Sequence, residues 1–300
     1  MRRSSSCFLN EETIETRIIY HTPHGDLSAV AHTTPAYADW LLLHPVKRWP
    51  VDMDAYADYF FAAPESLDLG EIDVVIAGVG EKGLVTTLIG ELFTSFLGTV
   101  REGGMAQTIL DLIDDPGYCS RLQSRYIQYC AALTRRILEE TSTQAVFINS
   151  GYSGLPILNR SLFRQWDRPV LAAVSAVCRE HDIPLHLHQH GRLIPIMEDI
   201  ISAGVSIVCP LLSSPQGDVD DLQAFKQRFG GRIAIKGNVD PFAVLQHGAP
   251  AEVERAVQKC ILDAAPNGGF ILGTADSTLT GTPFENIHTF VKAGRKYGKY

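Results

Sequence analysis

Several features that are absent from the sequence exclude whole classes of protein. It has no basic run beyond Met1-Arg2-Arg3 and carries a net charge of −8, which argues against a nucleic-acid-binding surface. No apolar run approaches the length needed to span a bilayer, and the N-terminus lacks the apolar core of a signal peptide. We therefore expect a cytoplasmic protein with neither a membrane nor a nucleic acid as partner.

The sequence also lacks any C-x-x-C pair. Its six cysteines are scattered, and several fall inside helix or strand patterns, where cysteine behaves as a small buried hydrophobe. A disulfide framework is therefore not expected, and no cysteine stands in a metal-ligand spacing. The six are Cys7, Cys119, Cys130, Cys178, Cys209 and Cys260.

No internal repeat, low-complexity tract or long linker divides the chain. With 300 residues and 45% hydrophobic content, it can bury one large core, so we predict a single domain over residues 1–300. Residues 1–70 form its N-terminal part. Here residues 1–10 are expected to be a loose start, and two strands at 13–20 and 27–33 should pair as an antiparallel β-hairpin.

From Ile72 onward, apolar strand-like runs alternate with helix patterns, which predicts parallel strands joined by helices. The predicted fold is a TIM-type (β/α)8 barrel. Only six strands are evident, near Ile72, Ala145, Ile183, Val205, Ile233 and Gly269, and residues 84–97 read as a helix. Because a closed barrel needs eight strands, we expect it to be incomplete or atypical at its N-terminal end, or to be completed by a partner chain.

The most informative stretch is Leu185-His186-Leu187-His188-Gln189-His190-Gly191. Alternation at period two predicts a strand with all three histidines on one face. In a parallel barrel that face looks inward, and the C-terminal end of the strand opens at the active-site mouth. His188 and His190 are then close enough to share a metal ion, and His186 would line the substrate cavity. The alternative is a polar inner layer of imidazoles that hydrogen-bond one another.

Other polar residues follow predicted strands, where a barrel places its site. Asn149 and Tyr152 are candidate substrate contacts, with hydrogen bonding within a loop as the alternative. Asn238 and Asp240 either contact substrate or shape a turn and cap the next helix. Arg192 either holds an acidic substrate or begins a helix in solvent.

The C-terminal third carries motifs that are similar to those of a known family. Residues 237–241 (G-N-V-D-P) and the segments 268–272 (G-G-F-I-L) and 282–286 (T-P-F-E-N) resemble the uroporphyrinogen decarboxylase superfamily, which also holds corrinoid-linked methyltransferases. The turn at 22–27 resembles the methyltransferase branch. The arginine-rich N-terminal segment typical of the decarboxylases has no counterpart here, which argues against uroporphyrinogen as the substrate.

This resemblance implies a barrel with its site at the C-terminal mouth. The methyltransferase branch holds zinc on an H-x-C pair and a distant cysteine. Against that pattern His188 matches the histidine, while His190 and Asp276 stand at or near the two cysteine positions. The implied set is two imidazoles and a carboxylate, a harder site than one with thiolates, which suits zinc or ferrous iron.

Three hypotheses follow. The first is a metal-dependent enzyme that transfers a methyl group to or from a small molecule. In it His188, His190 and Asp276 hold the metal, Asp240 and Tyr152 serve catalysis, and a corrinoid resides on a partner protein. The second is a metal-free decarboxylase with a cationic mouth. The third is a non-catalytic subunit or corrinoid-protein partner, and a homo-oligomer is compatible with all three.

Overall fold

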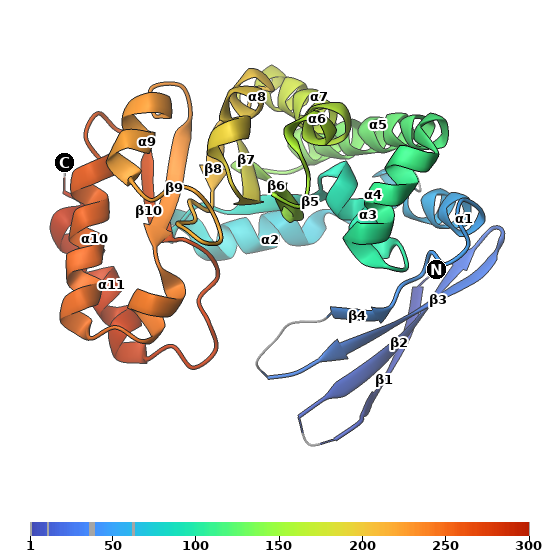
Figure 1. Cartoon of the computed structure of the whole chain (residues 1–300), viewed down its shortest axis with the longest axis horizontal. Coiled ribbons are helices and arrows are strands. Elements are labelled where there is room, and N and C mark those ends of the chain that lie inside the picture. Colours follow the sequence, from blue (N-terminus) through green and yellow to red (C-terminus); the bar gives the residue numbers. More distant parts are fainter. Residues whose placement is uncertain (1, 11, 36–39, 62–63, 300) are drawn as a thin grey trace.

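The computed structural model describes residues 2–10, 12–35, 40–61 and 64–299, without the side chains of Arg2, Arg3 and Tyr152. Its N-terminal part is a four-stranded antiparallel sheet, set apart from the rest of the fold in Figure 1. The strands follow the order β1 (Arg2–Phe8), β2 (Ile14–Thr22), β3 (Gly25–Thr33) and β4 (Trp40–Leu43). The predicted hairpin is thus confirmed as β2 and β3. The predicted loose start is wrong, because β1 pairs with β2 from Arg2 to Phe8.

A second sheet of six parallel strands forms the centre of the fold, in the order β10-β9-β8-β7-β6-β5. The strands are β5 (Thr86–Glu91), β6 (Ala145–Leu155), β7 (Leu185–Gly191), β8 (Ile207–Cys209), β9 (Ala234–Val239) and β10 (Phe270–Thr274). Among the described residues β5 and β10 are its two edges, so this part of the chain supplies six of the eight strands that a closed barrel requires.

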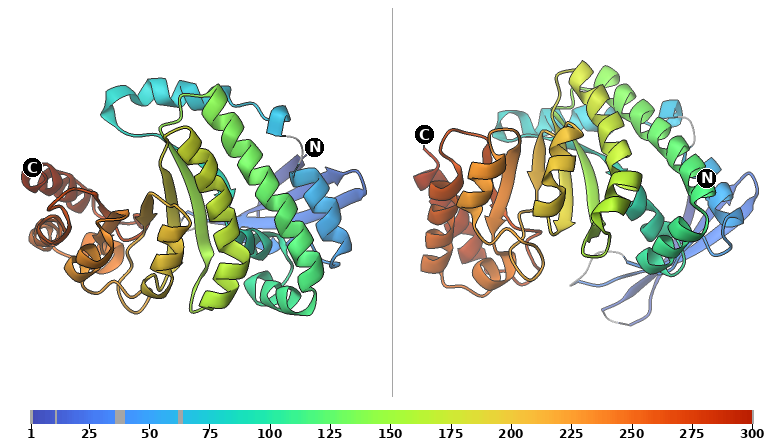
Figure 2. Two further views of the ribbon diagram at one scale, coloured as in Figure 1. Left: turned by 90° about the horizontal axis from the view of Figure 1, so that it is seen from above. Right: turned by 45° about the horizontal axis from the view of Figure 1, so that its top comes forward.

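Helices connect and cover these strands, as the views in Figures 1 and 2 show. Those that pack most closely on the sheet are α3 (Phe93–Val100), α5 (Pro116–Glu140), α7 (Arg168–Glu180) and α10 (Pro250–Ala264). The others are α1 (Val51–Phe60), α2 (Gly70–Val79), α4 (Gly104–Asp114), α6 (Arg160–Leu162), α8 (Met197–Ser202), α9 (Leu222–Phe229) and α11 (Phe284–Tyr297). No described helix is both long enough and apolar enough to cross a membrane.

Two predictions between residues 70 and 100 are wrong. Residues 72–77 form part of α2 rather than a strand, and no residue of α2 is fully buried. The first parallel strand is instead β5, which lies inside the predicted helix 84–97 and pairs with β6 from Thr86 opposite Ala145. A short apolar, β-branched run fits a buried strand and a helix equally well, so periodicity alone could not separate them.

The core lies between the parallel sheet and its helices. Large side chains such as Tyr126, Phe93, Phe163 and Trp166 are fully buried there. Asp167, at the end of a π-helical turn (Phe163–Asp167), is also fully buried and accepts hydrogen bonds from the backbone N–H and hydroxyl of Thr94 at the start of α3. These hydrogen bonds fix the turn that precedes α7 against the N-terminus of α3.

Candidate metal centre

The alternation of β7 divides its side chains between two environments. Leu185, Leu187 and Gln189 are fully buried under the helical layer. His186, His188 and His190 occupy the other face, where the ring of His188 lies 4.6 Å from that of His190 and 5.9 Å from Phe147 of β6. The strand therefore presents its three imidazoles as a row that ends at the mouth of the sheet.

Asp276 joins the last two imidazoles of this row. It follows β10 by two residues, and β10 lies three places from β7 in the sheet, so the curvature of the sheet and the loop after β10 bring the carboxylate across the mouth. The Nε2 atoms of His188 and His190 are 2.7 Å apart, and Asp276 Oδ2 lies 3.4 Å from Nε2 of His190. One donor atom from each residue lies within 4.8 Å of the other two.

Two glycines hold the end of β7 close to β6. A Cβ on Gly154 would collide with the carbonyl of His190, and a Cβ on Gly191 would collide with the carbonyl of Leu155. Gly191 also has a φ of +78°, in the left-handed region that favours glycine. The position of His190 thus depends on close backbone packing on both sides.

Cys209, the last residue of β8, links the histidine row from one side. Its Sγ lies 3.0 Å from Nε2 of His186 and 3.4 Å from Nδ1 of His188. If the Nδ1–H of His188 donates to this sulfur, the Nε2 lone pair of His188 is left to face His190 and Asp276. The Cys209 thiol can in turn donate to His186, because burial raises its pKa to about 12 and keeps it protonated.

Burial also keeps two of these imidazoles, those of His186 and His188, neutral. It lowers the pKa of His186 to about 4, with a further contribution from the charge of Lys236, and it lowers the pKa of His188 to about 4 together with neighbouring His190. For Asp276 burial acts to raise the pKa, but hydrogen bonds from His190 and from the backbone N–H of Ser277 outweigh it and leave the pKa below its usual value. A neutral His188 and an ionised Asp276 are the protonation states in which these two side chains bind a divalent cation.

The row continues onto the neighbouring strands. Asn149 of β6 pairs in register with His188 and donates from Nδ2 to Oε1 of Glu91, at the end of β5, over 3.1 Å. Burial raises the pKa of the Glu91 carboxyl, which also accepts from the hydroxyl of Thr99. Glu91, Cys209 and Lys236 were not identified from the sequence. Glu91 and Cys209 end their strands and Lys236 lies within β9, and strand pairing places all three level with His188.

The remaining predicted site residues make other contacts. Asp240 Oδ1 accepts from the backbone N–H groups of Phe242 and Ala243 and caps the turn that follows β9. Asn238 Oδ1 accepts from the thiol of Cys260 on α10, 3.5 Å away. The contacts of Asp240 are those of a residue that caps the next helical turn, and the predicted substrate contacts of Asn238 and Asp240 stay predictions.

Arg192 and Tyr152 complete the predicted set. The Nε of Arg192 lies 3.7 Å from Asp218, and 59% of the arginine side chain is exposed, as in the alternative of a solvated helix start. The side chain of Tyr152 lies outside the described residues, so its predicted role stays a prediction.

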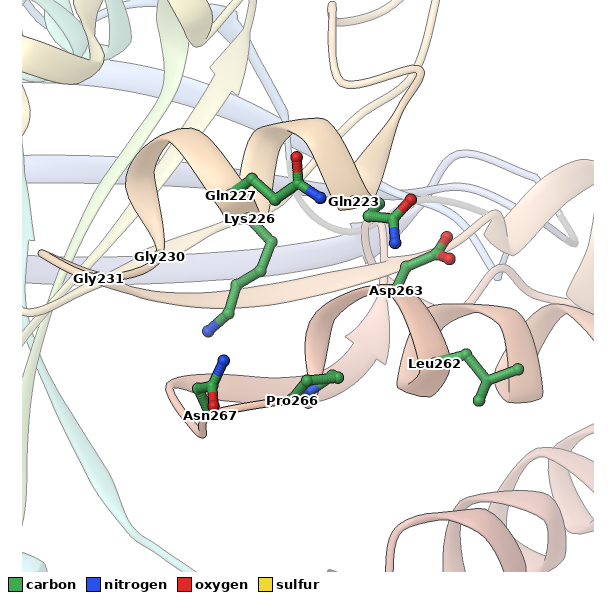
Figure 3. A pocket seen from close by; sticks show the side chains of 9 residues that line it. All are labelled: Gln223, Lys226, Gln227, Gly230, Gly231, Leu262, Asp263, Pro266 and Asn267. Atoms are coloured by element: carbon green, nitrogen blue, oxygen red, sulfur yellow. The ribbon is translucent and has the colours of Figure 1, made fainter.

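A hollow of about 350 Å³, drawn in Figure 3, lies away from this row. It is formed by α9, the end of α10 and the segment between α10 and β10, and it includes Lys226 and Asn267. Lys226 donates there to the carbonyl of Gly268, just before β10 begins. This hollow therefore lies at the N-terminal ends of the strands, away from the histidine row.

The donor set fits a divalent metal. Imidazole nitrogen and carboxylate oxygen suit zinc and ferrous iron, and three protein ligands leave coordination positions open for a substrate or water. The fold and the cluster of His188, His190 and Asp276 together define an α/β protein with a polar candidate binding site at the carboxyl ends of its parallel strands.

Comparison with known proteins identifies the family. The model of the family described as uroporphyrinogen decarboxylase (URO-D) matches residues 81–297, so the chain belongs to this family. The superfamily predicted from the sequence is confirmed, and the methyltransferase branch is among the matches.

Relatives come from both branches. A methylated-thiol–coenzyme M methyltransferase of Methanosarcina mazei is 24% identical over 148 residues, which are 49% of this chain and 36% of that protein. A uroporphyrinogen decarboxylase of Pseudoalteromonas atlantica is 27% identical over 131 residues, 41% of this chain and 33% of that protein. The matched segment thus spans about a third of the length of each relative.

One solved structure supports the fold. A methyltransferase from Methanosarcina mazei superimposes with a TM-score of 0.64 at 15% identity, over 89% of this chain and 74% of that one. The similarity in fold therefore extends well beyond the segment in which sequence identity is detected.

Proposed function

We propose that this protein is a metal-dependent enzyme that transfers a methyl group to or from a small molecule. The main support for this proposal is the convergence of His188, His190 and Asp276, whose donor atoms lie within 4.8 Å of one another. Membership of a family with a methyltransferase relative supports the reaction class. In this proposal residues 1–300 act as one cytoplasmic unit with a barrel-type site, and a corrinoid on a partner protein supplies or accepts the methyl group.

The three ligands would hold zinc, with ferrous iron as the alternative. When bound, the metal supplies Lewis acidity that lowers the pKa of a coordinated heteroatom or water. The chain's own residues prepare the site: Cys209 orients the ring of His188, and Asp276 places a carboxylate oxygen 3.4 Å from Nε2 of His190. The hydrogen-bonded pair of Asn149 on β6, next to β7, and Glu91 on β5 would orient the substrate.

The first test is metal content. Purified protein should carry about one divalent metal per chain, which a chelator removes and zinc restores. His188→Ala should lose this metal. His288→Ala, in an exposed position on α11, should retain it. A metal-free wild-type protein that also fails to take up zinc or ferrous iron would refute the proposal.

The second test separates the two branches. Metal-loaded protein is mixed with methylcobalamin and 2-mercaptoethanol, and transfer is followed by loss of the methylcobalamin spectrum. The methyl group passes to sulfur, the thiol proton is released, and cobalt keeps the bonding electron pair. Release of CO₂ from uroporphyrinogen instead would favour the decarboxylase. Within the described residues no arginine pairs with His186, His188, His190 or Asp276, as a carboxylate-gripping mouth would require.

A further inference from the structure

A second hollow lies between the N-terminal sheet and the helices that follow β5. It has a volume of about 310 Å³ and is formed by β4, the end of α3 and the start of α4 (Figure 1). Its apolar wall consists of the side chains of Trp40, Leu41 and Met105. An apolar wall of this kind with a few polar groups is the usual composition of a small-molecule site.

This hollow is distinct from the candidate metal centre. Thr99 lines it and donates a hydrogen bond to Glu91, which accepts another from Asn149 on the strand next to β7. The Glu91–Asn149 pair therefore stands between the hollow and His188. A ligand bound in the hollow requires neither a metal nor the proposed function.

The polar groups of the hollow are hydrogen-bond acceptors. Nδ1 of His44 lies 2.8 Å from the carbonyl oxygen of Thr99 and must donate to it, so Nε2 of the neutral ring is an acceptor. The hydroxyl proton of Thr99 is already donated to Glu91. The carbonyl of Gly98, in the last turn of α3, receives no hydrogen bond from any described residue. A ligand must therefore bring its own donors.

The surroundings of the hollow carry negative charge. Glu102 accepts a hydrogen bond from the backbone N–H of His44, and it forms no ion pair with any described residue. Its charge adds to the partial negative charge at the C-terminal end of α3. None of the described residues that line the hollow is a lysine or arginine, and neighbouring Arg101 is paired with Asp111. A cation is therefore favoured over an anion of the same shape.

Trp40 supplies an aromatic face for such a cation. Its side chain is 40% exposed, and the ring of His32 packs edge-on against it at 5.9 Å, which restricts its movement. An ammonium group is attracted to the face of an indole ring. Leu41 and the thioether of Met105 can contact a hydrocarbon group attached to the ammonium.

We propose that this hollow binds a small organic ammonium ion that keeps its N–H donors and carries an aromatic or branched hydrocarbon group. The ammonium group donates to the carbonyl of Gly98 and to Nε2 of His44, beside the ring of Trp40. The hydrocarbon group lies against Leu41 and Met105. The ligand contacts both β4 and α3, so its binding links the N-terminal sheet to the rest of the fold.

Three ligands of similar shape and different charge test this inference. Benzylammonium, benzyl alcohol and benzoate are titrated into the full-length protein at pH 7, and binding is followed by calorimetry and by tryptophan fluorescence. Benzylammonium should bind about tenfold more tightly than benzyl alcohol, as expected for a cation–π contact with a charged hydrogen bond. Benzoate should bind more weakly than the alcohol, because Glu102 repels it.

Two variants assign the preference to this hollow. Trp40→Leu should weaken benzylammonium binding by about tenfold and affect the alcohol less. Glu102→Gln keeps an acceptor for the N–H of His44 but removes the charge, and it should lower the preference for the ammonium by about threefold. Phe284→Leu and Glu285→Gln, at exposed positions at the start of α11, are the matched controls and should leave all affinities unchanged.

The inference is overturned if benzylammonium does not bind, if the three ligands bind alike, or if Trp40→Leu and Glu102→Gln both keep the wild-type preference. Circular dichroism checks that each variant is folded, and Glu102→Gln alone decides if Trp40→Leu is not. The same titrations on metal-free protein should give the same affinities, so this proposal and the proposed function fail separately.

Discussion

The sulfur of Cys209 lies 3.4 Å from Nδ1 of His188, the ring nitrogen opposite the one that approaches His190. A histidine that binds metal through one nitrogen usually has the other held by a hydrogen-bond acceptor, which fixes both tautomer and ring orientation. Here a buried thiol occupies that position. Cys209 is therefore a positioning residue in the proposed site rather than a metal ligand.

Replacement of Cys209 should weaken metal binding without abolishing it. We expect Cys209→Ala to raise the zinc dissociation constant by about tenfold, because the imidazole of His188 loses its orienting partner. Cys209→Ser keeps a hydrogen-bonding atom and should lose less. Zinc titration against a competing chelator measures both. Cys178→Ala, a buried cysteine on α7, controls for loss of volume, and equal effects of the two alanine variants would contradict this role.

The charge of Asp276 should matter as much as its shape. Asp276→Asn keeps the size of the side chain but removes the negative charge that would offset the charge of the metal. We expect the zinc dissociation constant to rise at least about tenfold. Asp263→Asn, on α10, should not change it. Equal zinc affinity of Asp276→Asn and wild type, by the same titration, would remove the carboxylate from the site.

Asp167 should make stability depend on pH. Burial raises the pKa of its carboxyl to about 7, against about 4 in an unfolded chain. Between these values the folded state holds the extra proton, so the contribution of Asp167 to stability is present below pH 4 and is lost as the pH rises to 7. The Asp167→Asn side chain does not titrate in this range. The free energy of unfolding of this variant, relative to that of the wild type, should therefore rise by about 3 kcal/mol from pH 5 to pH 8.

Urea unfolding at the two pH values measures this difference. Asp167→Ala serves as a second variant: it leaves the backbone N–H of Thr94 buried without a partner, which should cost about 2 kcal/mol at both pH values relative to Asp167→Asn. Parallel pH profiles of Asp167→Asn and wild type would show that the carboxyl is charged in the folded state.

A buried ion pair joins the chain before α1 to α4. Arg101 Nε lies 2.7 Å from Asp111, and the same guanidinium donates to the carbonyl of Lys47. Asp111→Ala should lower the free energy of unfolding by about 3 kcal/mol, because it leaves a buried charge uncompensated. Glu198→Ala breaks an exposed pair with Arg232 and should cost less than about 1 kcal/mol. Urea unfolding that finds equal costs would contradict this difference.

The parts of the fold that sequence predicts well have a clear period or clear ends. The histidine strand alternates without interruption, and α10 begins at Pro250 with Glu252 in its first turn, so both were located closely. The region from 70 to 100 failed because its apolar runs are short. There the pairing of β5 with β6, a tertiary contact, decides which residues extend.

The site was predictable only in part, for a similar reason. The spacing of His188 and His190 is local, and Asp276 was found through resemblance to a family motif. Cys209 and Lys236 belong to other strands, and their relation to His188 depends on strand order and register. Within its own strand, Lys236 reads as an ordinary polar residue.

The close packing of β6 on β7 has a consequence for how this site could change. Gly154 and Gly191 leave no room for even one methyl group between the two backbones. Any side chain at either position must push the strands apart and carry the ring of His190 away from that of His188. The position of the His190 ring therefore depends on two glycines that are not candidate metal ligands. A relative that keeps the same pair of histidines in the same geometry should keep both glycines as well.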